Sequence, residues 1–74
     1  MDYKEHINIE SGNRSGKPCI KGLRIAVCDV LNMLADGMTY DEILDDYPRL
    51  IKEDILACLA FAADKENTVT RLSA

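Results

Sequence analysis

The sequence contains no tryptophan, one phenylalanine and one histidine, and no apolar run approaches the roughly 18–20 residues that span a bilayer. The first six residues include three charged side chains, Asp2, Lys4 and Glu5, and lack the apolar core of a secretory signal. The 74 residues leave room for one domain, and a chain this short buries only about 60% of its unfolded surface. We therefore expect a single soluble, cytoplasmic domain that gains stability from a second copy or another partner.

Cysteine and histidine are too few, and too far apart, for the common catalytic and metal sites. The three cysteines, Cys19, Cys28 and Cys58, are odd in number and form no CxxC pair, which argues against a disulfide framework or a zinc site. His6 is the only histidine that a nucleophile could use as its base. We expect no catalytic residues, no metal and no other cofactor, and therefore no enzyme.

Charge is distributed unevenly along the chain. Residues 1–24 carry five cations and three anions, a net charge of +2, whereas residues 25–74 carry four cations and ten anions, a net charge of −6. An acidic body repels phosphate, so any contact with nucleic acid is expected from the first segment alone. The candidates for that contact are Arg14, Lys17, Lys21 and Arg24.

The first third of the chain is typical of short strands and turns. Ile7 and Ile9 alternate with Asn8, which is the period of a half-buried strand, and residues 19–20 and 25–27 are further short β-prone pieces. Residues 10–16 are rich in glycine, serine and asparagine, which favour turns. The pattern predicts a strand-and-loop arm over residues 5–26 with two or three short strands.

From Val27 onward the apolar residues recur with helical spacing. The pattern predicts a first helix of about ten residues, ended by Gly37 in a left-handed conformation. Thr39 and Glu42 form a capping box for a second helix from about residue 40 to residue 47, and Pro48 stops it. A third helix is predicted from about Lys52 to residue 65, followed by a frayed tail over residues 67–74.

These elements predict a mainly α, three-helix bundle of the helix-turn-helix type with a short β-rich N-terminal arm. The single domain covers residues 1–66, with its helical body over residues 27–66. The first turns of the third helix offer Glu53 and Asp54 where a DNA-reading helix normally presents basic or amide side chains. The basic arm is therefore the better candidate for DNA, although its cations can equally pair with acids of the body or of a partner.

Exposed strand edges and an alanine-rich helix flank are the surfaces on which we expect self-association or another protein. A homodimer is predicted through them. The candidate contact residues are Ile7, Ile9, Ala57, Ala60 and Phe61.

Several motifs in the chain resemble one bacterial family. Residues 16–27 read GKPCIKGLRIAV, and they are followed by LADGMT at residues 34–39, EIL at 42–44, DYP at 46–48 and EDI at 53–55. This series resembles the family called domain of unknown function 433, over about residues 7–64. The resemblance implies a winged or homeodomain-like helix-turn-helix fold.

The same resemblance implies a function. Several such proteins are regarded as antitoxins of type II toxin–antitoxin pairs, so the implied role is to bind and neutralise a PIN-like nuclease toxin. The alternatives are a promoter-DNA-binding repressor that uses the basic arm, and a purely structural dimerisation module. An acidic body suits a basic, RNA-binding toxin through charge complementarity.

The chain departs from the family pattern at four positions. Ser15 stands where a glycine is common, and Leu23 and Ala26 replace a usual threonine and proline near Arg24. Ile51 takes the place of the hydroxyl residue that normally caps the third helix. We expect its loss to fray the start of that helix at a cost on the order of 1 kcal/mol.

Overall fold

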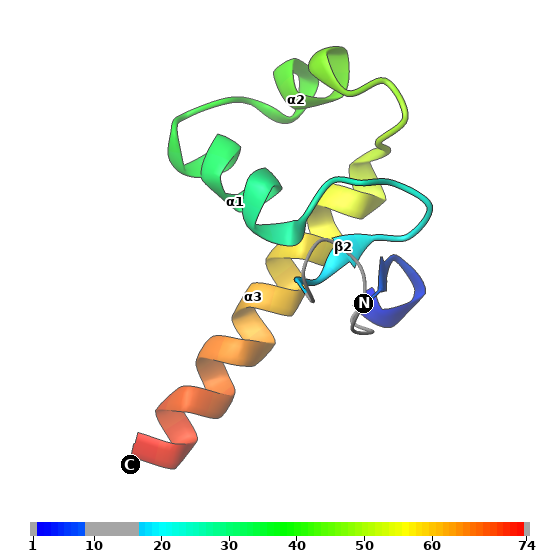
Figure 1. Cartoon of the computed structure of the whole chain (residues 1–74). Helices are drawn as coiled ribbons and strands as arrows, with labels where there is room; N and C mark the ends of the chain where they lie inside the picture. The colour runs from blue at the N-terminus through cyan, green and yellow to red at the C-terminus, as the bar shows by residue number, and fades with distance from the viewer. Residues whose placement is uncertain (1, 9–16, 74) are drawn as a thin grey trace.

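The computed structural model describes residues 2–8 and 17–73. It consists of a small N-terminal sheet followed by three helices (Figure 1). A short 3-10 helix, η1 (Tyr3–Glu5), precedes strands β1 (Ile7–Asn8) and β2 (Cys19–Ile20). Helices α1 (Val27–Ala35), α2 (Tyr40–Asp46) and α3 (Lys52–Ser73) complete the chain. The mainly helical bundle with a short β arm is confirmed, with α2 and α3 consecutive and joined by residues 47–51.

The two strands form a small antiparallel sheet. Ile7 lies opposite Ile20, and Asn8 opposite Cys19. The third predicted piece, residues 25–27, is not a strand. It makes one isolated bridge, between Ala26 and Cys19, because the chain turns at residues 21–24 and enters α1 at Val27.

The second helix begins where the sequence predicts. The backbone N–H of Glu42 donates to Thr39 Oγ1 over 3.1 Å, and the N–H of Thr39 donates to Glu42 Oε1 over 2.8 Å, so the capping box is confirmed. Gly37 has a φ of +92°, the left-handed conformation expected after α1. The helix ends at Asp46, one residue before the predicted end at Tyr47.

The third helix is longer than predicted. It continues to Ser73, so the predicted end near residue 65 is wrong by eight residues. The reason lies in the sequence, because no glycine or proline follows Lys52 to end the helix.

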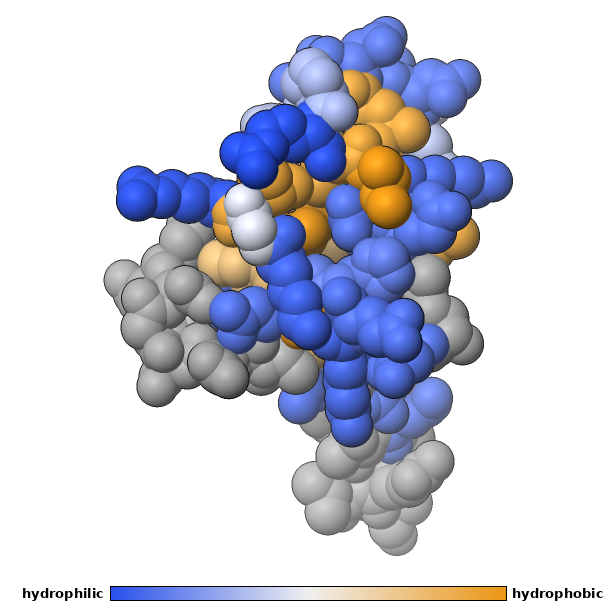
Figure 2. Space-filling model, turned by 90° about the vertical axis from the view of Figure 1, so that its right-hand side faces the viewer, coloured by the Kyte–Doolittle hydropathy of each residue, from blue (hydrophilic) through white to orange (hydrophobic). Residues whose placement is uncertain are grey.

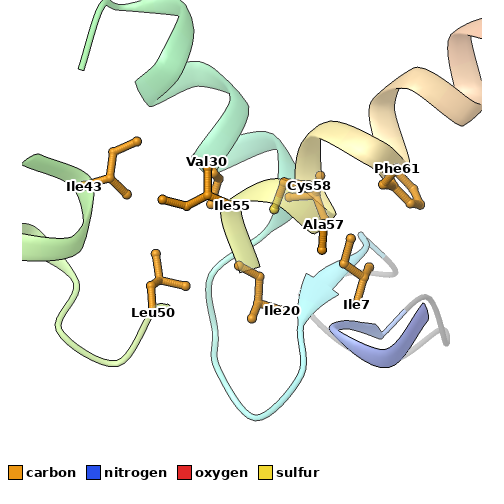
Figure 3. Close-up of a cluster of buried hydrophobic side chains, with 10 residues drawn as sticks. Ile7, Ile20, Val30, Ile43, Leu50, Ile55, Ala57, Cys58 and Phe61 are labelled. Carbon is orange, nitrogen blue, oxygen red and sulfur yellow. The ribbon is translucent and has the colours of Figure 1, made fainter. Parts of the chain in front are cut away.

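The core lies where the first half of α3 meets α1, α2 and the small sheet. Figure 3 shows the cluster: Ile55, Ala57 and Cys58 of α3 lie near Val30 of α1, with Ile20 and Ile7 on the side of the sheet. Ile43 and Leu50 reach the same cluster from α2 and from the connection after it. All of these side chains are at most 4% exposed, and Phe61, at 9%, is the last residue of the core.

Candidate partner-binding surface

The predicted basic residues lie on the N-terminal arm, but they do not form one site. Lys17, Lys21 and Arg24 are all exposed, whereas Arg14 lies outside the described residues. Lys17 and Arg24 line two different grooves. Lys21 lines neither of these two grooves.

The first groove, here called the arginine groove, lies between the turn after β2 and the connection from α2 to α3. Its volume is about 230 Å³. Figure 2 faces this side of the molecule and shows an apolar strip bordered by strongly hydrophilic atoms. The groove is lined by Leu23, Arg24, Ile25, Asp46, Tyr47, Pro48 and Arg49.

The charges at this groove include a cation that the sequence analysis did not single out. Arg49 lies 25 positions after Arg24, and the fold brings both to one groove. The Nη2 atom of Arg49 donates a long hydrogen bond, 3.5 Å, to the carbonyl oxygen of Gly22. A positive charge close to Arg24 was not detectable from the local charge pattern, because only the turn after α2 positions it.

Two large apolar side chains of the connection from α2 to α3 are exposed, and one of them, Tyr47, lines the arginine groove. Tyr47, in the groove, is 39% exposed, and Ile51, four residues later, is 51% exposed. Exposed apolar side chains that cluster beside charged ones are typical of protein-binding surfaces.

The second groove, here called the cysteine groove, is larger and almost wholly apolar. Its volume is about 370 Å³. Cys28, at its edge, is the exposed member of the three free cysteines. The groove is lined by Lys17, Pro18, Val27, Cys28, Leu31 and Phe61.

The end of α3 forms a third feature, which we call the helical arm, residues 66–73. Up to Asp64 the helix is tied to the N-terminus: Tyr3 Oη donates to Asp64 Oδ2 over 2.6 Å, and the ring of Tyr3 packs edge-on against Phe61 at 5.5 Å. The carboxylate of Asp64 raises the pKa of Tyr3 through this hydrogen bond. Beyond that point α3 extends away from the other elements (Figure 1).

The start of α3 depends on a buried carboxylate that the sequence analysis interpreted differently. Asp54, only 8% exposed, accepts a hydrogen bond from the N–H of Ile51 at 3.1 Å, and its other oxygen lies 3.0 Å from His6 Nδ1. Asp54 therefore supplies part of the cap that Ile51 cannot, and it does not face an incoming ligand. Of the two acids expected to repel DNA at this helix, only Glu53 is exposed.

The structure also places the residues predicted to contact a partner. Ile7 and Ala57 are in the core at 2% and 0% exposure, and Phe61 packs there too, so the hydrophobic effect within one chain already explains their apolar character. The prediction of a partner contact through these three side chains thereby loses its basis. Ala60 is half-buried and stays a candidate, and Ile9 lies outside the described residues.

Comparisons with known proteins identify the family. The model of the family described as "Protein of unknown function (DUF433)" matches residues 7–62 of the chain. The chain belongs to the DUF433 family. No curated protein matches it.

A solved structure agrees with this assignment. A DUF433 member protein from Anabaena variabilis ATCC 29413 superposes with a TM-score of 0.76 at 28% sequence identity. The match covers 88% of this chain and 64% of that one, so the present chain spans less than two thirds of that relative's length.

Two further properties of the described residues bear on the class of site. Within residues 2–8 and 17–73, no three histidine, cysteine or acidic side chains are arranged to hold a metal ion. None of the helices in this part of the chain has the length and apolarity needed to cross a membrane.

Proposed function

We propose that this DUF433 protein is a non-enzymatic regulator of the antitoxin type, which binds and neutralises a PIN-like nuclease toxin. The observation that supports this most is the helical arm. It follows the last core residue, Phe61, and its first two residues, Glu66 and Asn67, are exposed. Eight helical residues extend about 12 Å, a length that suits insertion into a groove of another protein.

The arm gains its helical stability from the packed part of α3. An isolated helix shorter than about 12–15 residues is marginal in water, and most helical stability in proteins comes from packing. The arm continues a helix whose first half is packed, so it is preformed, and binding it costs less ordering entropy than folding a disordered tail.

The charge of the helical body suits the same partner. The four acids of α2 are all exposed, and the segment from residue 25 to residue 74 has a net charge of −6. A nuclease that binds RNA presents basic surface, and opposite charges accelerate association and exclude wrong partners. The α2 acids are Asp41, Glu42, Asp45 and Asp46.

Capture from the native host tests the proposal. We expect the tagged full chain to retain a stoichiometric PIN-like nuclease through a moderate-salt wash. A Val69→Pro variant removes a helix hydrogen bond within the arm, two turns beyond Phe61, and should lose the nuclease while its thermal unfolding stays near that of the wild type. Recovery of the chain alone, or equal capture by Val69→Pro, would contradict this role for the arm.

Binding of promoter DNA is a second candidate function. The observation that favours it is that Lys17, Lys21 and Arg24 are exposed on one arm. DNA from upstream of the protein's own gene should then bind with an affinity that falls steeply as salt rises. Lys17→Ala and Arg24→Ala should each reduce the salt slope by about 1, whereas the control Lys65→Ala should not. Absent or salt-insensitive binding would exclude this function.

A further inference from the structure

The arginine groove presents both signs of charge on one patch. Arg49 and Asp46 line the groove together with Arg24, and Asp45 lies next to Asp46 on the exposed surface of α2. Neither Arg49 nor these two aspartates form an ion pair with any other described residue. Within the described part of the chain, Arg49 and the two aspartates therefore have no ion-pair partner.

Apolar side chains line the same groove as these charges. Leu23, Ile25 and Pro48 form the walls of the groove, and Tyr47 stays 39% exposed within it. Ile51, the most exposed of the large apolar residues at 51%, follows on the same connection. A volume of about 230 Å³ can receive an aliphatic side chain of that size.

A patch that carries both signs of charge beside apolar side chains can pair with a second copy of itself. In a two-fold symmetric dimer, residue i of one copy meets residue j of the other, and residue j meets residue i. Arg49 of each copy can then meet Asp46 of the other, while the two apolar strips cover one another. A different protein would need the same two charges around an apolar centre, whereas a second copy has them by construction.

From this charge arrangement we propose that a second copy of the chain docks on the arginine groove and forms a two-fold symmetric dimer. This dimer uses another surface than the one predicted from the sequence, because three of the five residues predicted there, Ile7, Ala57 and Phe61, lie in the core. A typical specific interface buries about 800 Å² on each partner. That is roughly a sixth of the 5076 Å² surface of this small chain, so the dimer would cover a substantial part of it.

Charge reversal tests the pairing without identifying any other ligand. Sedimentation equilibrium of the full chain should show a concentration-dependent dimer. Arg49→Asp and Asp46→Arg each place like charges opposite one another at two symmetric positions, and each should weaken dimerisation more than tenfold. The double variant restores opposite charges in the homodimer and should recover the wild-type constant within about threefold.

Controls separate this surface from a general effect of charge or folding. Asp36→Arg makes the same change at an exposed position at the end of α1, and it should leave dimerisation unchanged. Ile51→Asp should weaken the dimer as strongly as Arg49→Asp. Far-UV circular dichroism verifies that every variant is folded.

Three outcomes would overturn the proposed dimer. A wild-type chain that is monomeric at 500 µM overturns it and leaves the groove to a different protein. It is also overturned if the single variants dimerise normally, or if the double variant stays monomeric. None of these outcomes depends on the nuclease, so the dimer and the proposed antitoxin role can fail separately.

Discussion

At the residue scale, Asp54 connects two parts of the chain that are 48 positions apart. Its carboxylate receives the N–H of Ile51 at the start of α3 and faces the imidazole of His6 next to β1. A buried acceptor with two partners is costly to remove, because the donors that it leaves behind lose their hydrogen bonds.

We expect Asp54→Ala to lower the free energy of unfolding by about 2 kcal/mol, since the N–H of Ile51 and the ring of His6 both lose an acceptor. Asp54→Asn keeps one acceptor oxygen and should cost less. The exposed neighbour provides the control, and Glu53→Ala should cost about 0.5 kcal/mol at most. Urea denaturation measures all three, and equal losses for Asp54→Ala and Glu53→Ala would contradict the role given to the buried carboxylate.

The cysteines also differ at this scale. Burial, together with the nearby carboxylate of Asp54, raises the pKa of Cys58 to about 12, so it stays a protonated thiol at neutral pH. Cys19 is buried as well, and its Sγ lies 3.4 Å from the carbonyl oxygen of Lys17. Cys28 is exposed.

Ellman's reagent at pH 8 should therefore modify one thiol rapidly in the native protein and all three in denaturant, because the thiolate is the reactive form. A Cys28→Ser variant should lose the rapid phase. Two or three fast thiols in the native wild type would show that the buried positions open to solvent. At pH 8 the raised pKa of Cys58 does not change the stability, because the thiol is mostly protonated in both the folded and the unfolded chain. The free energy of unfolding falls only as the pH rises above about 9, the ordinary pKa of the group.

At the scale of the element, the capping box gives α2 a dependence on pH. Hydrogen bonds from Thr39, first from its backbone N–H, lower the pKa of Glu42 below its ordinary value of 4.5. A carboxyl group whose pKa is lowered by folding stabilises the folded state above its unfolded pKa. That stabilisation is lost as the pH falls through the folded value.

We therefore expect the melting temperature of the wild type to fall more between pH 5 and pH 3 than that of Glu42→Gln, which has no charge to lose. Thr39→Ala should cost about 1 kcal/mol at neutral pH. The matched control Asp41→Asn removes an exposed acid of the same helix and should keep the wild-type profile. Parallel profiles for Glu42→Gln and the wild type would contradict this account of the cap.

The elements show which features the sequence was able to predict. Local signals are sufficient for α2, because Thr39, Glu42 and Pro48 mark its ends through interactions within a few residues. The length of α3 was underestimated because apolar periodicity marks the part of a helix that packs in the core, and here the helix continues to Ser73, beyond the last core residue, Phe61. The cap at Ile51 was misjudged because its replacement, Asp54, is held by His6 from the other end of the chain.

At the scale of the whole molecule, the family and the three-helix architecture could be predicted from motifs that cover most of the chain. The surfaces could not. Ala57 and Phe61 look like a flank for a partner on a helical projection, but the sheet and η1 cover that side of α3. Arg49 joins Arg24 only through the folding of the connection after α2. Which apolar residues remain exposed depends on tertiary packing, and a single sequence does not contain that information in local form.

The central claim is that this DUF433 protein neutralises a nuclease. The most direct measurement is cleavage of a fluorescent RNA by the nuclease recovered from the native host, titrated with the purified full chain. We predict that cleavage stops at about one equivalent of the wild type and continues with an equal amount of Val69→Pro. Undiminished cleavage at a tenfold excess of the wild type would contradict the claim.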